Sequence, residues 1–162
     1  MEGIYILLGT NLGDREANLE AARQYIQDQV GTIMHASPIY ATAAWGLLEQ
    51  PDFLNQVVQI HTTQPPETLL QTLLYIEEQM GRIRRVKWGE RLIDLDILYY
   101  RNEVVDRPNL QVPHPGIAQR RFTLVPLADL APDALHPTLG KTQTELLEAC
   151  TDDSEVKRHS GN

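Results

Sequence analysis

The chain has 162 residues, of which 42% are hydrophobic and 22% are charged, a size and composition typical of one compact globular domain. Its apolar runs fall well short of the roughly 20 residues that cross a bilayer, which argues against a membrane-spanning helix or a membrane partner. The formal net charge of −8 excludes a general electrostatic attraction to nucleic acid or anionic lipid.

The N-terminal segment predicts a strand, a turn and a helix. Ile4–Leu8 is rich in β-forming residues and lacks the basic leader of a signal peptide, so we expect a cytoplasmic protein. The turn formers of Gly9–Asp14 then lead to a helix capped near Asp14. No lysine follows Gly13 in the manner of a P-loop, which favours a structural turn. The helix should bury an apolar stripe of Leu19, Ala22, Ile26 and Val30.

The next segments predict further strands and a second helix. Residues 33–42 are rich in β-branched and small residues, and Phe53–Thr63 has the alternation of a stronger strand. The loop between them, residues 43–52, is long for a simple connection. Pro65 and Pro66 then open a helix that Gly81 should close. Its buried stripe is expected to contain Leu69, Leu73, Ile76 and Met80.

A concentration of basic residues follows the second helix. Five of the 14 lysines and arginines fall between Arg82 and Arg91, in a stretch whose one acidic residue is Glu90. Such a run is typical of a solvated loop, but it also suits the binding of an anion. The five basic residues are Arg82, Arg84, Arg85, Lys87 and Arg91.

The remainder predicts a strand at Ile93–Tyr100, a proline-punctuated stretch at residues 112–116, and helical turns. Cys150 is the one cysteine, so no internal disulfide can form, and a buried or inert thiol is expected. We expect one domain over residues 1–150 and a disordered tail over residues 151–162. The element order predicts an α+β fold, a mostly antiparallel sheet with its main helices on one face, compatible with a ferredoxin-like sandwich.

Asp94 and Asp96 are the strongest candidates for chemistry. Side chains two residues apart on a strand point to the same face, so the two carboxylates should stand side by side. An acidic strand face exposed to water would explain an isolated pair of this kind. The preceding basic run changes that balance, because arginines and Mg²⁺ are the usual partners of a polyphosphate. The pair therefore predicts a magnesium site beside bound phosphates.

Residues 87–98, KWGERLIDLDIL, resemble the signature of the 6-hydroxymethyl-7,8-dihydropterin pyrophosphokinases of folate biosynthesis. Other segments resemble the same family in the same order along residues 4–130. These segments are Leu8–Asp14, Gln50–Asn55, Glu77–Arg84 and Val112–Phe122.

The resemblance implies a ferredoxin-like fold and transfer of pyrophosphate from ATP to the hydroxymethyl group of the pterin, giving AMP and the pterin diphosphate. It further implies that Asp94 and Asp96 hold two Mg²⁺ ions and that Arg82 and Arg91 act with them in catalysis. A monomer is the expected state. The implied pterin contacts are Thr42, Ala43, Trp45, Phe53, Asn55, Trp88 and Phe122. The implied ATP contacts are Glu77, Arg82, Arg84, Arg91, Ile97, Gln111, Val112, His114 and Arg120.

The chain departs from the family pattern at Ala43–Trp45, where a proline often follows the threonine, and at Asn109 and Pro115, where some members have other residues. Two alternatives remain open at this point. One is a metal-dependent nucleotidyl- or glycosyltransferase, although the Gly-Ser helix start expected before a nucleotidyltransferase Asp-x-Asp is missing. The other is a ferredoxin-like binding module in which the basic run holds a regulatory anion.

Overall fold

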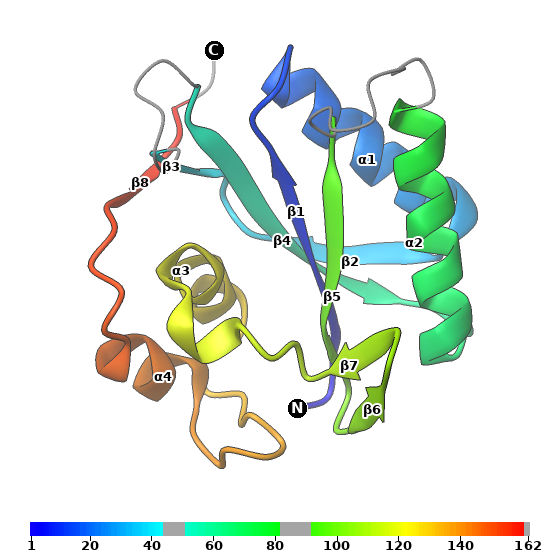
Figure 1. Ribbon diagram of the computed structural model, residues 1–162. Coiled ribbons are helices and arrows are strands. Elements are labelled where there is room, and N and C mark those ends of the chain that lie inside the picture. The colour runs from blue at the N-terminus through cyan, green and yellow to red at the C-terminus, as the bar shows by residue number, and fades with distance from the viewer. Residues whose placement is uncertain (44–50, 82–91, 161–162) are drawn as a thin grey trace.

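The protein is an open antiparallel sheet with helices on both faces (Figure 1). The computed structural model describes residues 1–43, 51–81 and 92–160. The strands are β1 (Ile4–Thr10), β2 (Thr32–Ala36), β3 (Tyr40–Thr42), β4 (Phe53–His61), β5 (Asp94–Tyr100), β6 (Val105–Arg107), β7 (Leu110–Val112) and β8 (Val156–Arg158). The helices are α1 (Arg15–Gln29), α2 (Pro66–Gly81), α3 (Arg121–Leu130), α4 (Gln143–Ala149) and the short 3-10 helix η1 (Ile117–Gln119).

The topology confirms the predicted α+β class. Among the described residues, five strands follow the order β5-β1-β4-β3-β8, and β2 also pairs with β4. Every pairing in this sheet is antiparallel. With α1 after β1 and α2 after β4, the order of elements is the repeated β-α-β arrangement of a ferredoxin-like fold. The strands β6 and β7 form a separate hairpin.

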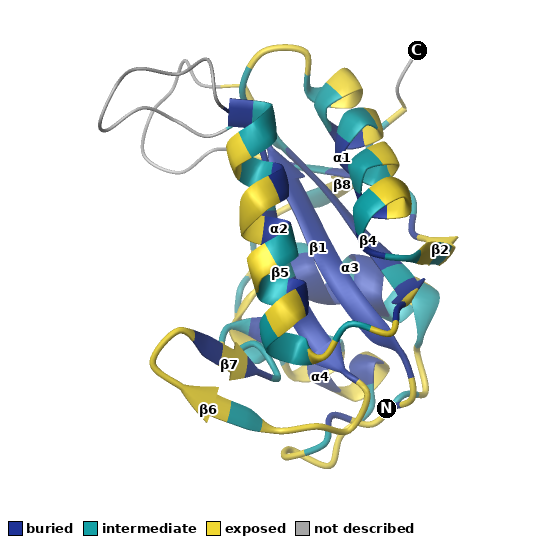
Figure 2. Ribbon diagram, turned by 90° about the vertical axis from the view of Figure 1, so that its right-hand side faces the viewer, coloured by how far each residue is buried: buried dark blue, intermediate teal, exposed yellow. Residues whose placement is uncertain are grey.

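The sheet separates two hydrophobic cores. The first packs α1 and α2 against residues such as Ile6, Leu8 and Ile97, and the two helices lie side by side in Figure 2. The second packs α3 and α4 against Leu7, Val57 and Tyr99. The expectation that the main helices share one face holds for the two longest, whereas α3 and α4 cover the opposite face. That opposite face carries the cavity described below.

Local signals explain where the helices begin. The carboxylate of Asp14 accepts the backbone N–H of Ala17 at 3.1 Å, so α1 starts at its predicted cap. Pro66 opens α2 and Gly81 ends it, as expected. The predicted turn from Gly9 is wrong at its start, because β1 continues through Gly9 to Thr10. Pairing with strands on both sides carries β1 two residues past the end indicated by its apolar run.

A β-bulge in β5 affects which side chains reach each face. Tyr5 pairs with Tyr99 and Ile6 pairs with Ile97, so Leu98 is the extra residue. Ile97 packs in the first core, while Leu98 and Tyr99 both pack in the second. The bulge lies after Asp96, so the regular alternation that puts Asp94 and Asp96 on one face is preserved.

The predicted disordered tail is wrong for residues 156–158. These residues form β8, which pairs with the outer edge of β3 and follows it closely in Figure 1. The sequence does not predict this strand, because Val156 is its single apolar residue. The strand forms by pairing of its backbone with β3 and not by burial of an apolar face. None of the helices in the described ranges has the length and apolar character needed to cross a membrane.

Candidate active site

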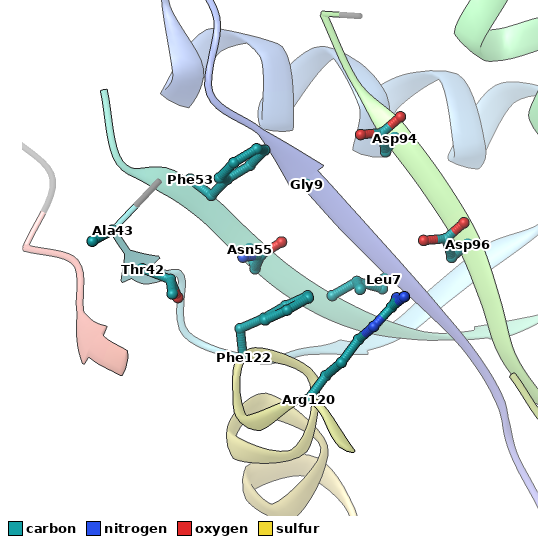
Figure 3. A pocket seen from close by; sticks show the side chains of 10 residues that line it. All are labelled: Leu7, Gly9, Thr42, Ala43, Phe53, Asn55, Asp94, Asp96, Arg120 and Phe122. Carbon is teal, nitrogen blue, oxygen red and sulfur yellow. The ribbon is translucent and has the colours of Figure 1, made fainter. Parts of the chain in front are cut away.

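Three neighbouring strands form the floor of a cavity of about 290 Å³ on the α3 side of the sheet. Gly9 of β1 pairs with Asn55 of β4 and with Asp94 of β5. Residues paired in this way face the same side of a sheet, as do residues two positions along each strand. The floor therefore consists of Leu7, Gly9, Phe53, Asn55, Asp94 and Asp96 (Figure 3).

The wall of the cavity comes from two other elements. Thr42 and Ala43 lie at the end of β3, and Arg120 and Phe122 lie at the start of α3. In Figure 3, the rings of Phe53 and Phe122 lie on either side of Asn55. An aromatic pair around a polar amide is suited to a flat ring with a hydrogen-bonding edge.

Two buried polar side chains, Thr42 and Asn55, line this cavity. Thr42 Oγ1 is buried and has no hydrogen-bond partner among the described residues. Asn55 is 5% exposed and lies directly against Gly9, where an added Cβ would stand 2.7 Å from Asn55 Oδ1. Because buried polar groups are normally paired, the Thr42 hydroxyl is available to a polar ligand in the cavity.

Asp94 and Asp96 stand together on β5, and both are half-buried. Two hydrogen bonds hold the start of their strand: the Thr10 hydroxyl donates to the Leu92 carbonyl at 2.6 Å, and the Leu95 N–H donates to Glu77 at 2.7 Å. The described residues contain no group of three or more metal-ligating side chains. A two-carboxylate set fits Mg²⁺, which keeps several waters and binds substrate phosphates.

A second cavity of about 280 Å³ adjoins the first and shares Asp96 with it. Three of the expected ATP contacts lie together there, namely Ile97, Gln111 and His114. Asn109 and Pro115, the two departures from the family pattern, also line it. Asp96 therefore borders both cavities.

Other expected ATP contacts are placed differently. Val112 is 1% exposed and packs in the first core, so it supports the second cavity from behind instead of lining it. Arg120 lines the first cavity. Glu77 accepts the Leu95 N–H at 2.7 Å and so acts on β5.

His114 is held in one tautomer. The Gly116 N–H donates to Nδ1 at 3.0 Å, so a neutral ring carries its proton on Nε2 and can donate from there. Burial lowers the pKa of His114; nearby Asp96 raises that pKa and Arg120 lowers it. The His114 backbone N–H also donates to Leu98 O at 2.9 Å, which fixes the residue against β5.

Several predicted site residues fall outside the described ranges. These are Trp45, Arg82, Arg84, Trp88 and Arg91. The structure brings together the other pterin candidates, Thr42, Ala43, Phe53, Asn55 and Phe122, around one cavity with both aspartates.

Two lining residues, Leu7 and Gly9, were missed by the sequence reasoning. The signal for Leu7 was the strand period, since it alternates with core residues on β1. Gly9 was hidden because glycine after an apolar run predicts a turn. Knowledge of its pairing with Asn55 was needed to see that the missing side chain makes room for the amide.

Comparison with known proteins identifies a family. Residues 5–132 match the family model described as 7,8-dihydro-6-hydroxymethylpterin-pyrophosphokinase (HPPK). Two relatives named 2-amino-4-hydroxy-6-hydroxymethyldihydropteridine pyrophosphokinase, from Pseudomonas aeruginosa and Methylorubrum extorquens, are each 39% identical, over 151 and 159 residues. The alignments cover 93% of both chains in the first case, and 98% of this chain and 99% of the relative in the second.

The fold is also similar to solved structures. A crystal structure of wild-type Plasmodium falciparum HPPK-DHPS with SDX-DHP superposes with a TM-score of 0.72 at 18% identity. The match covers 91% of this chain and 43% of the solved chain, so the present chain spans less than half of that protein. The likeness in structure supports the fold, and the matches in sequence support a closer kinship. The chain belongs to the 7,8-dihydro-6-hydroxymethylpterin-pyrophosphokinase family.

Proposed function

We propose that this protein transfers the pyrophosphoryl group of ATP to the hydroxymethyl group of 6-hydroxymethyl-7,8-dihydropterin, in folate biosynthesis. Family membership supports the reaction and the acceptor. The observation that carries the proposal at the level of the site is that two cavities meet at Asp96. One cavity suits a flat polar ring and the other extends away from it, so the carboxylates lie where the two substrates would react.

The first cavity would hold the pterin. Phe53 and Phe122 would stack against the two faces of the ring, with Asn55 and the unpaired Thr42 hydroxyl bonding to its polar edge. The exposed backbone near Ala43 would add main-chain contacts. This arrangement leaves the hydroxymethyl group facing β5, where both aspartates stand.

The second cavity would hold ATP. Ile97 and Gln111 would contact the nucleotide, and His114 would donate a hydrogen bond from Nε2 to a phosphate. Arg120 lines the neighbouring cavity and would contribute a cation to the phosphates at the junction. Glu77 and Val112 would act from behind, by holding β5 and the cavity wall.

Asp94 and Asp96 would hold Mg²⁺, with two ions proposed. Bound there, the metal would offset charge on the phosphates and help align the reacting oxygen. The transfer itself is direct: the pterin hydroxyl oxygen bonds to the β-phosphorus, and the bond from that phosphorus to the oxygen bridging toward the α-phosphate breaks. AMP leaves with the bridging oxygen, and the hydroxyl proton is released. The protein residues position both substrates and exclude water.

Five further roles are proposed on the family resemblance alone. Trp45 and Trp88 would contact the pterin, and Arg82, Arg84 and Arg91 would contact ATP, with Arg82 and Arg91 stabilising charge in the transition state. We also propose a cytoplasmic monomer. Light scattering after size exclusion would then give a mass near the chain mass of 18.4 kDa, and a dimer mass would contradict it.

The experiment that tests the reaction identifies the nucleotide product. The purified protein is incubated with ATP, Mg²⁺ and 6-hydroxymethyl-7,8-dihydropterin, and nucleotides are separated by chromatography. AMP that forms only when pterin and Mg²⁺ are both present supports the proposal. Formation of ADP, or no turnover by protein shown to be folded, would reject it. Omission of the pterin and addition of a chelator serve as separate controls, since each removes one required component.

A further inference from the structure

The wall of the pterin cavity is made of two short pieces that are far apart in the sequence. Thr42 and Ala43 end the three-residue strand β3, and Arg120 and Phe122 begin α3. Short elements hold their positions through neighbouring contacts more than through their own hydrogen bonds. The contacts that fix these two pieces therefore determine the shape of the cavity.

The start of α3 is capped from outside the helix. Its N-cap residue, Arg120, makes no capping hydrogen bond with its side chain. Instead, the backbone N–H of Arg121 donates to Asp152 Oδ2 at 3.0 Å. Arg121 is the residue between Arg120 and Phe122, so a carboxylate near the C-terminus holds the turn that presents both side chains to the cavity.

The same carboxylate directs the chain toward β3. The Ser154 N–H and hydroxyl both donate to Asp152 Oδ1, at 3.0 and 2.6 Å. These bonds, with the one from Arg121, keep the pKa of Asp152 below its usual value. One oxygen of Asp152 thus binds α3 while the other holds a turn that leads into β8.

Strand β8 then pairs along the free edge of β3. Val156 pairs with Thr42, and Arg158 pairs with Tyr40. The ladder continues where the His159 N–H donates to Ile39 O at 2.8 Å. On its other edge β3 pairs with β4, so β8 completes a three-strand arrangement around Thr42.

We propose that residues 152–159 form a positioning strap that sets the distance between the two parts of the pterin wall, with Asp152 as its central residue. The inference rests on the proposed function, since it names the pterin as the ligand. The strap touches neither substrate in this arrangement. It holds Thr42 on β3 and Phe122 on α3 at a fixed spacing, and small displacements of such groups weaken binding of a rigid ring.

The central test compares three single substitutions. Asp152→Ala removes both sets of hydrogen bonds, whereas Asp152→Asn keeps one acceptor oxygen and so can retain one of the two sets but not both. Asp153→Ala removes the same charge from the adjacent, exposed position. We expect Asp152→Ala to raise the KM for pterin at least about fivefold, because Thr42 and Phe122 lose their fixed spacing, and to raise the KM for ATP by a smaller factor, because the same turn presents Arg120.

A second pair of substitutions acts on β8 without touching Asp152. By the alternation of an antiparallel ladder, the Lys157 N–H faces Ala41, two residues before the His159 donor. Lys157→Pro removes that donor and Lys157→Ala keeps it. We expect the proline variant to raise the KM for pterin and the alanine variant to leave it unchanged. Hydrogen exchange should increase in residues 39–43 in the proline variant only.

The wild-type assay for pterin-dependent AMP comes first, so failure of the proposed function is seen before any variant is compared. The strap is supported if Asp152→Ala raises the KM for pterin more than the KM for ATP, if Asp152→Asn has a smaller effect than Asp152→Ala, and if Lys157→Pro raises the KM for pterin alone. Asp153→Ala and Lys157→Ala should resemble the wild type. It is overturned if Asp152→Ala lowers the melting temperature with both KM values unchanged, or if Lys157→Pro leaves the KM for pterin unchanged or raises both KM values together. Should Asp152→Ala not fold, the Lys157 pair alone decides the matter by the same criteria.

Discussion

At the scale of single residues, Asp96 occupies the most informative position, because it borders both cavities. Asp96→Asn preserves the shape of the side chain and removes its charge. We expect kcat to fall at least ~10³-fold, about 4 kcal/mol of transition-state stabilisation, with the unfolding midpoint nearly unchanged. AMP formation and thermal unfolding would be measured side by side.

The control for this substitution is Asp106→Asn, on the exposed part of β6, which should affect neither quantity. We expect Asp94→Ala and Asp96→Ala to behave as Asp96→Asn does. A structural role would instead appear as marked unfolding of the Asp96 variant at the assay temperature.

Gly9 offers a second test on the floor of the first cavity. A Cβ at this position would stand 2.7 Å from Asn55 Oδ1, so Gly9→Ala must displace the amide. We expect the KM for pterin to rise roughly tenfold, which corresponds to about 1.4 kcal/mol and is typical of one displaced hydrogen-bonding group. An unchanged KM would mean that Asn55 does not contact the pterin. Isothermal titration with pterin would distinguish weaker binding from slower chemistry.

His136 gives the protein a dependence of stability on pH. The side chain is 6% exposed, and burial lowers its pKa below 6.5. Below pH 6.5 the unfolded chain binds more protons at this residue than the folded chain does, so the free energy of unfolding falls as the pH is lowered. Well above pH 6.5 the ring is neutral in both states and contributes no dependence on pH.

We therefore expect His136→Asn to flatten the loss of stability between pH 6.5 and 5.5, measured by urea unfolding at each pH. Asparagine cannot titrate, yet its oxygen can replace Nδ1, which accepts the N–H groups of Thr138 and Leu139. The matched control is His35→Asn on the exposed strand β2. An equal slope for the wild type and for His136→Asn would contradict the assignment.

At the scale of elements, Tyr40 joins β3 to α3. Its hydroxyl donates to the carboxylate of Asp129. Burial and this carboxylate raise the pKa of Tyr40 to about 12, so the phenol remains a neutral donor at physiological pH. Tyr40→Phe should cost about 1–2 kcal/mol of stability and lower the melting temperature by roughly 2–8 °C for a chain of this size.

The control for Tyr40→Phe is Tyr75→Phe, on the exposed face of α2, where the residue is 51% exposed. Calorimetry would compare both variants with the wild type. Equal melting temperatures for all three proteins would show that the contact between Tyr40 and Asp129 adds nothing to stability.

The sequence predicted those elements whose signals are local. The apolar stripe and the cap at Asp14 located α1, and the prolines and Gly81 located α2. Strand β8 and the end of β1 were missed because they depend on pairing with residues distant in the chain. The same distinction applies to the site: the strand period placed Asp94 and Asp96 together, whereas Gly9 acquires its role only from Asn55 across the ladder.

The resemblance to the family supplied what spacing could not. Phe53 and Phe122 have the pattern of core residues, and the structure places both around the first cavity. Val112 is buried in the core beside the second cavity, so its expected part in shaping the nucleotide site stays a prediction.

At the scale of the whole molecule, one sheet shared by two cores suggests a single cooperative unit. We expect residues 1–150 to unfold as one domain, with the calorimetric enthalpy equal to the van't Hoff enthalpy. The C-terminal residues should unfold in the same transition, because β8 belongs to the sheet. A calorimetric enthalpy well above the van't Hoff value would contradict a single domain. Circular dichroism and fluorescence should give coincident transitions in urea.

The position of β5 at the border of the sheet has a consequence for solubility. A bordering strand offers unpaired backbone groups to any other chain that approaches, and such edges nucleate aggregation unless they are blocked. Here two residues occupy the outer edge. Glu77 accepts a hydrogen bond from the Leu95 N–H, and the His114 N–H donates to the Leu98 carbonyl. The two contacts that hold β5 in position also block its outer edge, so a second molecule cannot add a strand there. The same residues therefore orient the aspartate strand and lower its tendency to aggregate.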